Sequence, residues 1–330
     1  MVKKRPSAPT MKDVAREAGV SLGTVSKVIN GIPVGDAYRL RVESAAKSLG
    51  YTVNNYARGL KTNRTNCVAL VIPSLRHPFF AVLADEISAC LARHGYHCIL
   101  MITNFDPEAE RNSLVMVRQN KADGIIALTY SPNLEVDESL PIVTIDRHFS
   151  EGIPCVSSDN FHGGELAAET LTRLGCRNLL MFQIGAEVPG EPHKRCDGFE
   201  HFCRAEDVRF HSIVLRDADT EAPFYAYLAE HIQNGAPDFD GIFCSSDMLA
   251  CGVRAFLSEH GVGVPEDVQI IGYDGITDYS TGRYLCSTIV QPIPDMARTA
   301  VDILLGWEAR LMLPVRYAPG GTTRDKEEQA

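Results

Sequence analysis

The chain contains 330 residues, 45% of them hydrophobic, which is enough for two or three domains with separate cores. Its formal net charge of −10 is distributed unevenly along the sequence. Residues 1–64 contain 12 Lys and Arg against 4 Asp and Glu, whereas the remaining residues contain 20 against 38. A small basic segment is suited to phosphate contact, and the acidic remainder disfavours indiscriminate binding to nucleic acid. The alternative for the basic segment is a solvated tail.

The cysteines and the apolar runs argue against several classes of protein. Most of the ten cysteines lie in apolar runs and no CxxC occurs, so we expect reduced, buried thiols. The nearest cysteine pairs, Cys196 with Cys203 and Cys244 with Cys251, are seven positions apart, and we therefore expect neither a metal site nor a cofactor. No apolar run approaches the roughly 20 residues that span a bilayer, and the beginning lacks the apolar core of a signal peptide. These features predict a soluble, cytoplasmic protein with no membrane partner.

From Thr10 the sequence predicts a helix, a tight turn and a second helix. Apolar residues recur at helical spacing from Val14 to Ala18, and Gly19 then allows the positive φ of a helix C-terminus. Ser21 supplies a side chain that caps the next helix. A third helix over about residues 36–48 carries enough apolar side chains to complete a three-helix unit. In such a unit the second helix enters the major groove of DNA.

The stretch DVAREAGVSLGTVSKVIN resembles the headpiece of the lac repressor (LacI/GalR) family. The resemblance implies base-reading positions at Leu22, Gly23 and Lys27. It also implies positions near the phosphates of double-stranded operator DNA at Thr10, Ser21, Thr24, Ser26 and Asn30. Leucine offers only apolar contact, glycine offers no side chain, and lysine lacks the bidentate fork that arginine presents to guanine. The operator sequence therefore cannot be transferred from relatives. A generic amphipathic helical hairpin is the alternative.

A second resemblance follows in YTVNNYARGLKTNRT, which is similar to the hinge segment of the family. The matching positions are Asn54, Ala57, Arg58 and Leu60, and in the family paired hinge helices enter the minor groove, where a leucine, here Leu60, wedges between base steps. So short a helix does not offset its nucleation cost in water, and Gly59 weakens it by up to about 1 kcal/mol. We therefore expect it to form only with DNA and the hinge of a partner chain, which implies a homodimer. A disordered linker is the alternative.

Beyond Asn66 short apolar runs alternate with helical segments, a pattern that predicts βαβ units. Continuous apolar strands indicate parallel sheets that are covered on both faces. The predicted fold class is α/β, with a small all-α helix-turn-helix headpiece and two doubly wound parallel-sheet lobes of the periplasmic-binding-protein-like type I. A helix over about residues 295–310 is expected near the end, and the tail from residue 320 is expected to end in solvent and to be mostly disordered.

The predicted domains follow from these patterns. They are a DNA-binding headpiece over residues 1–50, a hinge helix and linker over 51–64, and an effector-binding and dimerisation domain over 65–330. Within the last domain, lobe one covers about 65–159 and 292–315, and lobe two covers about 160–290 and the C-terminal segment.

Several predicted strands of the body end on polar groups, and ligands of parallel sheets bind beyond the carboxyl ends of the strands. These groups are Ser74, Asp146, Asp159, Ser246 with Asp247, and Asp274. Carboxylates and hydroxyls beside a ring from Phe79 or Phe80 suit a polyhydroxylated ligand, whose hydroxyls both donate and accept hydrogen bonds. The alternative for each aspartate is a helix N-cap, and the alternative for the two phenylalanines is a place in the core.

Segments similar to the family recur across the body, among them HPFF, IDR, SSDN, RCDGF, SSDMLACG, VPEDVQIIGYD and STIVQP. The resemblance thus covers nearly the whole chain. It implies effector contacts at Arg195, Asp274 and Gln291, with Asp146, Ser246 and Phe79 as secondary positions. Ser246 stands where the family usually has asparagine, and the shorter side chain leaves room for a larger ligand or a bridging water.

These observations predict a sequence-specific DNA-binding transcription regulator, in the first place a repressor of carbohydrate-utilisation genes. A small sugar or sugar phosphate is expected to control its operator affinity allosterically. A sugar receptor without a DNA role shares the two lobes but has no use for a basic headpiece. The enzymatic alternative is a carbohydrate hydrolase with Asp146 and Asp274 as paired carboxylates, and we expect no enzyme. The sequence leaves open which sugar acts, whether it releases or recruits DNA, and whether a corepressor protein takes part.

Overall fold

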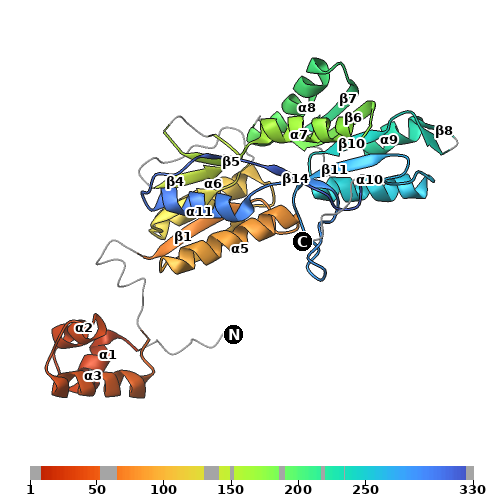
Figure 1. The fold of residues 1–330 in the computed structure, drawn as a ribbon. Coiled ribbons are helices and arrows are strands. Elements are labelled where there is room, and N and C mark those ends of the chain that lie inside the picture. The colour runs from red at the N-terminus through yellow and green to blue at the C-terminus, as the bar shows by residue number, and fades with distance from the viewer. Residues whose placement is uncertain are drawn as a thin grey trace. The chain divides into compact units, whose positions relative to one another are not determined.

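The computed structural model describes residues 9–52, 65–129, 141–148, 152–185, 190–216, 220–233 and 235–324. The chain divides into two compact units, Met1–Thr65 and Asn66–Ala330. Figure 1 shows helices alone in the first unit and two sheets with helices on both faces in the second. This arrangement confirms the predicted fold class. The predicted hinge positions Asn54, Ala57 and Leu60 lie outside the described residues.

The first unit, the headpiece, contains three short helices around a small core. They are α1 (Met11–Ala18), α2 (Leu22–Ile29) and α3 (Asp36–Leu49). Helix α1 begins with a capping box, in which the side chains of Thr10 and Asp13 each accept the other's backbone N–H, and Gly19 ends it at a φ of 59°. Ser21 caps α2 by accepting the backbone N–H of Thr24. The buried core residues are Val14, Ala15, Ala18, Val25, Val42 and Ala45.

The first sheet of the body forms lobe one, with the strand order β13-β5-β4-β3-β1-β2 and all neighbouring strands parallel. Its strands are β1 (Cys67–Ile72), β2 (His97–Ile102), β3 (Gly124–Ala127), β4 (Ile142–Ile145), β5 (Cys155–Ser158) and β13 (Met312–Leu313). The sheet is covered on one face by α5 (Pro78–Arg93) and α11 (Ile293–Leu304), and on the other by α6 (Pro107–Gln119). Since both faces are covered, the strands consist almost entirely of apolar residues.

The second sheet forms lobe two, with the order β14-β12-β11-β10-β6-β7, and is parallel except for β14, which is antiparallel to β12. Its strands are β6 (Asn178–Gly185), β7 (Arg209–Arg216), β10 (Gly241–Cys244), β11 (Gln269–Asp274), β12 (Thr288–Val290) and β14 (Arg316–Ala318). One face is covered by α7 (Asn160–Arg173) and α8 (Lys194–Ala205), the other by α9 (Ala222–Glu230) and α10 (Asp247–Glu259). A short 3-10 helix, η1 (Glu191–His193), precedes α8, and a hairpin of β8 (Ile232–Gln233) and β9 (Ala236–Pro237) follows α9.

The chain crosses between the lobes after β5, after β12 and after β13, so each lobe is built from separate stretches of sequence (Figure 1). The carboxyl ends of β5 and β12 lie at these crossings. Polar residues that end the strands of either lobe are therefore brought toward the junction of the two sheets, where ligands of doubly wound folds bind.

Two expectations about the end of the chain were wrong. Helix α11 ends at Leu304 rather than near residue 310, because Gly306 adopts a φ of 90° directly after it. The tail from residue 320 is not disordered as far as Arg324. Thr322 is buried, donates its hydroxyl to the carbonyl of Ile270 at 2.7 Å and accepts the backbone N–H of Ser287 at 2.8 Å. These bonds satisfy backbone groups of the lobe-two sheet.

All ten cysteines carry free thiols. Among the described residues, no helix combines the length and the apolar character that crossing a membrane requires.

Candidate functional site

Helix α2 turns three of the predicted DNA-reading positions outward. Val25 is fully buried in the core of the headpiece, whereas Leu22, Gly23 and Lys27 are exposed. The exposed face of α2 therefore presents the apolar side chain of Leu22, the backbone of Gly23 and the positive charge of Lys27.

The polar residues beside this face bond within the headpiece. The hydroxyl of Ser21 accepts the backbone N–H of Thr24 at 3.1 Å and shares a second hydrogen bond with the Thr24 hydroxyl at 2.9 Å. Asn30 donates from Nδ2 to the carbonyl oxygen of Ser26 at 2.7 Å, and Thr10 caps α1. These bonds fix the ends of the two helices, and so they hold the exposed face of α2 in a defined orientation.

In the body, several strand-end polar groups serve the fold. Asp159 accepts the backbone N–H of His162 and caps α7, and Ser246 accepts that of Leu249 and caps α10. Asp247 is fully buried, and its carboxylate accepts hydrogen bonds from a backbone N–H, a hydroxyl and a thiol of lobe two. Asp159 and Ser246 therefore act as helix N-caps, the alternative considered for strand-end residues, and the contacts of Asp247 are structural.

Asp146 and Asp274 differ from the capping residues. They follow β4 of lobe one and end β11 of lobe two, and they are only 5% and 3% exposed. Oδ1 of Asp146 and Oδ2 of Asp274 are buried without a hydrogen-bond partner. Both residues adopt a positive φ, of 60° and 121°, which L-residues rarely do. Unpaired buried acceptors on strained backbone are typical of a binding site.

Arg195 of α8 lies beside Asp274 and is held by other residues of lobe two. Its Nε donates to Asn160 Oδ1 at 2.7 Å, and its Nη1 donates to the carbonyl oxygen of Ser245 at 2.7 Å. Nη1 lies 3.9 Å from Asp274 Oδ1, and the guanidinium carbon lies 3.7 Å from the centre of the Tyr273 ring. The cation is thus fixed by hydrogen bonds on its edge and by an aromatic ring on its face.

Gln291 links Asp274 to Ser158, the last residue of β5, after which the chain crosses from lobe one to lobe two. Its Nε2 donates to Asp274 Oδ1 at 2.8 Å, and its Oε1 accepts the hydroxyl of Ser158 at 2.8 Å. We call the whole group the Arg195 cluster. It comprises Asp146, Ser158, Asn160, Arg195, Tyr273, Asp274 and Gln291.

The pKa shifts show that groups from both lobes act on one another here. Burial raises the pKa of Asp146 to about 6 and raises that of Asp274 well above its usual range, while the charge of Arg195 lowers both. Burial and the charge of Arg195 also lower the pKa of His77, in lobe one, to about 4. At neutral pH Asp146 is therefore mostly ionised and His77 is neutral.

The comparisons with known proteins decide the family. Residues 10–54 match the family described as bacterial regulatory proteins, lacI family, and residues 65–309 match periplasmic binding proteins and the sugar binding domain of the LacI family. The chain belongs to the LacI family. It is a DNA-binding transcription regulator with an effector domain of the sugar-binding type.

Relatives of this LacI-family protein are similar over nearly their whole length. It is 35% identical to the sucrose operon repressor of Streptococcus mutans, covering 89% of this chain and 91% of that protein. It is 33% identical to the ribose operon repressor of Bacillus subtilis, covering 96% and 99%. A crystal structure of a periplasmic binding protein/LacI transcriptional regulator from Alkaliphilus metalliredigens, complexed with D-xylulofuranose, is 28% identical with a TM-score of 0.68, covering 79% and 100%.

In the structure of this LacI-family protein, four of the predicted effector positions lie together and two serve the fold. Asp146, Arg195, Asp274 and Gln291 lie in one cluster, whereas Ser246 caps a helix. Phe79 is buried together with Phe80 in the core of lobe one.

Asn160, Tyr273 and Ser158 belong to the cluster and were not predicted from the sequence. Two of them adjoin predicted positions, since Tyr273 precedes Asp274 and Asn160 follows the strand-end Asp159.

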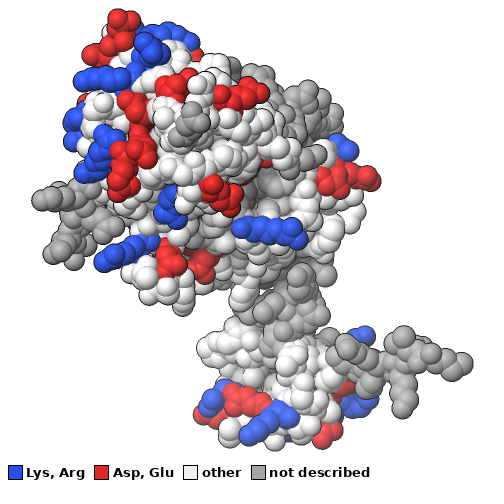
Figure 2. All heavy atoms as spheres, turned by 90° about the vertical axis from the view of Figure 1, so that its right-hand side faces the viewer, with Lys and Arg blue, Asp and Glu red and all other residues white. Residues whose placement is uncertain are grey.

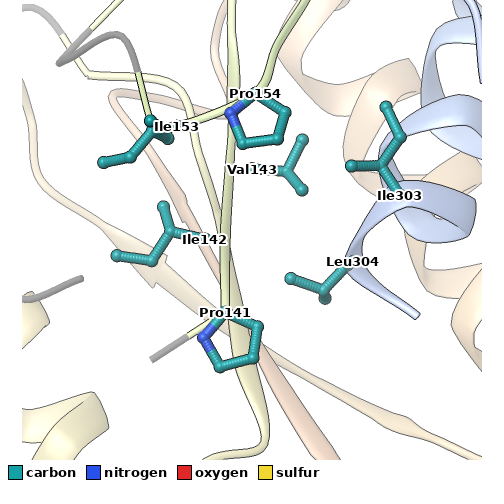
Figure 3. Close-up of a pocket in the computed structure, with 8 residues that line it drawn as sticks. Pro141, Ile142, Val143, Ile153, Pro154, Ile303 and Leu304 are labelled. Atoms are coloured by element: carbon teal, nitrogen blue, oxygen red, sulfur yellow. The ribbon is translucent and has the colours of Figure 1, made fainter. Parts of the chain in front are cut away.

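A separate hollow of about 320 Å³ lies in lobe one between β4, the residues before β5 and the end of α11 (Figure 3). The residues that line it carry no polar side chain and include Pro141, Ile142, Pro154, Ile303 and Leu304. Because Pro141 and Pro154 directly precede β4 and β5, the hollow lies at the amino ends of these strands. The Arg195 cluster contains the groups at carboxyl ends, where ligands of such sheets bind.

Glu191 bonds the two lobes to each other beside Asp146. Its backbone N–H donates to the carbonyl oxygen of Asp146 at 3.0 Å. Its buried carboxylate accepts from His148 Nε2 of lobe one at 2.9 Å and from Lys194 Nζ of lobe two at 2.7 Å. Gly190 permits this approach, because a Cβ there would lie 2.8 Å from the Asp146 carbonyl oxygen.

We expect Glu191→Gln to lower the free energy of unfolding by about 1–2 kcal/mol, because a buried charged hydrogen-bond acceptor is lost. The matched control is Glu165→Gln, whose half-buried carboxylate accepts from the exposed His201 at 2.8 Å. This change should cost less than about 0.5 kcal/mol, since exposed pairs contribute little. Urea unfolding of both variants measures the difference. Equal effects would show that Glu191 contributes no more than a surface pair.

Proposed function

We propose that this protein represses genes for the use of a sugar, binding operator DNA as a homodimer and changing its affinity for DNA when sugar occupies the Arg195 cluster. The observation that carries the proposal is the pair of unpaired carboxylate oxygens, one from each lobe, in a chain with a helix-turn-helix headpiece. The names of the similar sucrose and ribose operon repressors, and the xylulofuranose bound to a similar structure, support a sugar effector.

For the DNA contacts we propose that α2 lies in the major groove, with Leu22, Gly23 and Lys27 toward the bases. The proposed phosphate neighbours are Thr10, Ser21, Thr24, Ser26 and Asn30. The proposed minor-groove contacts of the hinge are Asn54, Ala57 and Leu60. The body is less suited to DNA, since residues 65–330 contain 20 Lys and Arg against 38 Asp and Glu, and Figure 2 shows acidic side chains among the basic ones on the face in view.

For the sugar, Asp146 and Asp274 accept hydroxyl groups, and Gln291 and Arg195 hold Asp274 in position. Because Asp146 also bonds Glu191 through its backbone, sugar that binds Asp146 alters the contact between the lobes. A shift of the lobes changes the spacing of the two hinge segments of a dimer, which couples sugar to DNA by a free energy of typically about 1–3 kcal/mol.

The homodimer is supported by the edge of the lobe-one sheet at β2, beyond which no further strand lies among the described residues. Strand β2 ends the sheet order, and its Leu100 and Ile102 are exposed, as is Val82 on the neighbouring α5. Apolar side chains on an unpaired edge strand are typical of a surface that another chain covers. A second copy also supplies the second hinge segment.

A regulator of this kind acts in the cytoplasm, where its operator lies. The carboxylates of the cluster serve binding and no enzymatic reaction in this proposal. A sugar receptor without a DNA role fits less well, because the capped headpiece and its exposed α2 face then have no partner.

Lys27→Ala is expected to weaken operator binding about tenfold, because Lys27 contacts DNA on the exposed face of α2. Lys47→Ala removes the same charge from the exposed surface of α3 and should change affinity less than about twofold. Fluorescence anisotropy with a duplex selected from a random pool, titrated with salt, measures both variants and the parent. A log-log salt slope near zero for the parent would refute the proposed function.

A further inference from the structure

One side of α10 lies against the segment that leads into β12. Asp247, Cys251 and Arg254 recur at helical spacing, so they lie on the same side of the helix. Asp247 Oδ1 accepts the thiol of Cys286 at 3.4 Å. One turn beyond Cys251, Arg254 Nη1 donates to the carbonyl oxygen of Leu285 at 3.4 Å. Cys251 lies between these two contacts, and its sulfur is hydrogen-bonded to that of Cys286.

Gly272 of β11 leaves the space in which this contact forms. A Cβ at this position would lie 2.8 Å from the sulfur of Cys286 and would also collide with Asp247. Because glycine has no side chain, Cys286 packs directly against α10. The fold thus brings together two thiols that are distant in the sequence.

The two thiols differ in exposure and in acidity. Cys251 is half-buried, whereas Cys286 is only 1% exposed. The hydrogen bond from Cys286 and the charge of Arg254 lower the pKa of Cys251 to about 7, although burial and Asp247 oppose them. The pKa of Cys286 is raised well above its usual value by the hydrogen bond to Cys251 and by burial. At neutral pH a large share of Cys251 is therefore thiolate, the nucleophilic form of the side chain.

We infer that Cys251 is a site of reversible oxidation by hydroperoxides and that Cys286 resolves the oxidised form as a disulfide. The Cys251 thiolate attacks one peroxide oxygen, the O–O bond breaks, and the leaving hydroxide takes up the proton that the thiol had lost, which gives a sulfenic acid and water. The sulfur of Cys286 then attacks that of Cys251, the S–O bond breaks, and the Cys286 proton leaves with the hydroxyl group as a second water. Two thiols are oxidised and one peroxide is reduced. Disulfides of cytosolic proteins are usually transient and redox-sensing, as this one is.

Oxidation changes the contacts of a carboxylate next to the Arg195 cluster. Besides the thiol of Cys286, Asp247 accepts the backbone N–H of Ile276 at 2.7 Å and the hydroxyl of Thr288 at 2.6 Å. Ile276 lies two residues after Asp274. A disulfide removes the thiol donor and draws Cys286 toward α10, so the backbone that follows Asp274 loses part of its support. We expect the disulfide to lower sugar affinity about fivefold or more, an effect that rests on the proposed function.

The test is peroxide oxidation of the reduced full-length protein, with the remaining thiols blocked by N-ethylmaleimide. We expect the intact mass before blocking to fall by two hydrogens, the peptide map to join Cys251 to Cys286, and dithiothreitol to reverse both changes. Oxidation that spares Cys251 would overturn the inference. A disulfide from Cys251 to another cysteine would do the same, as would a sulfinic acid at Cys251 in place of a disulfide.

Two variants separate the roles of the thiols. Cys286→Ser keeps a hydroxyl donor for Asp247 but cannot form the disulfide, so the sulfenic acid at Cys251 should persist and react with dimedone. Cys98→Ser is the matched control, since Cys98 is also half-buried but burial raises its pKa to about 11. It should form the disulfide as the parent does. A Cys286→Ser protein that still loses two hydrogens, with no dimedone adduct, would overturn the role of Cys286.

Calorimetry of the reduced and oxidised parent with D-ribose, D-xylulose, D-fructose and sucrose measures the effect on sugar binding. Weaker binding that dithiothreitol restores supports the link between the disulfide and the Arg195 cluster. Equal affinity in the two states would overturn that link. A reduced protein that binds none of these sugars and whose operator affinity none of them changes would contradict the proposed function, whereas the mass and the peptide map would still decide the redox pair.

Discussion

Asp274→Ala should abolish the response to sugar and leave operator affinity in the absence of sugar unchanged. The substitution removes an acceptor whose Oδ2 is buried and unpaired, and it deprives Gln291 Nε2 of its acceptor at 2.8 Å. Losing a charged hydrogen-bond partner weakens sugar binding by roughly 100-fold. The headpiece is a separate compact unit, so its contacts with DNA do not depend on Asp274. Calorimetry with sugar and anisotropy with operator DNA measure the two properties separately.

Asp159→Ala is the matched control, because Asp159 also follows a strand but accepts the N–H of His162 as a helix cap. It should lower stability by about 1 kcal/mol and leave sugar affinity nearly unchanged. Asp274→Asn serves as a second variant, since asparagine has nearly the same size and shape as aspartate but carries no charge. A full sugar response in both Asp274 variants would contradict the assignment.

Asp146 and Asp274 affect stability in the opposite direction to a carboxylate that caps a helix. Their contribution to the free energy of unfolding falls as the pH rises, whereas that of a capping carboxylate increases. Burial raises the pKa of both, to about 6 for Asp146, from an unfolded value near 3.9. Over this range the folded chain holds protons that the unfolded chain has released. Asp146 therefore opposes folding increasingly as the pH rises from about 4 through 6, and Asp274 does so from about 4 up to its own raised pKa. Asp274→Ala should consequently not lower the melting temperature above pH 6, unlike the loss of a cap.

The strand-end polar groups explain how far the sequence could predict the site. Apolar runs located the carboxyl ends of the strands, and an aspartate or serine there is visible without a structure. Asp159 and Ser246 are followed directly by helices and cap them, whereas Asp146 is followed by non-helical chain and Asp274 by Gly275 in a loop. A strand-end aspartate without a following helix was thus the available signal.

Other features depend on contacts that no local pattern encodes. Thr322 and Thr323 belong to a polar stretch that is typical of a solvated tail, yet both are buried against lobe two. Phe79 lies in a segment similar to the family's ligand-contacting region, but α5 turns its ring into the core of lobe one. In each case tertiary packing overrides the composition of the segment.

The position of Arg195 depends on glycines where α7 meets α8. A Cβ on Gly164 would collide with the backbone carbonyl of Arg195, and one on Gly198 would collide with that of Phe161. A Cβ on Gly163 would meet the Tyr273 ring, on which the guanidinium of Arg195 is stacked. Helices α7 and α8 thus pack with their backbones in contact. This close packing fixes the position of Arg195 relative to Asp274.

Gly198→Ala should therefore be among the most damaging conservative substitutions in the body. Backbone atoms cannot rotate away as a side chain can, so α8 must shift, at a cost of about 1–3 kcal/mol or more. Arg195 lies one helical turn before Gly198 and moves with α8, so sugar affinity falls together with stability. Gly252→Ala in α10 is the control, because its Cβ would meet the side-chain ends of Tyr225 and Glu221 rather than backbone atoms. Thermal unfolding and calorimetry with sugar follow both effects. A Gly198→Ala protein as stable as the Gly252→Ala protein would show that the α7–α8 approach does not position the cluster.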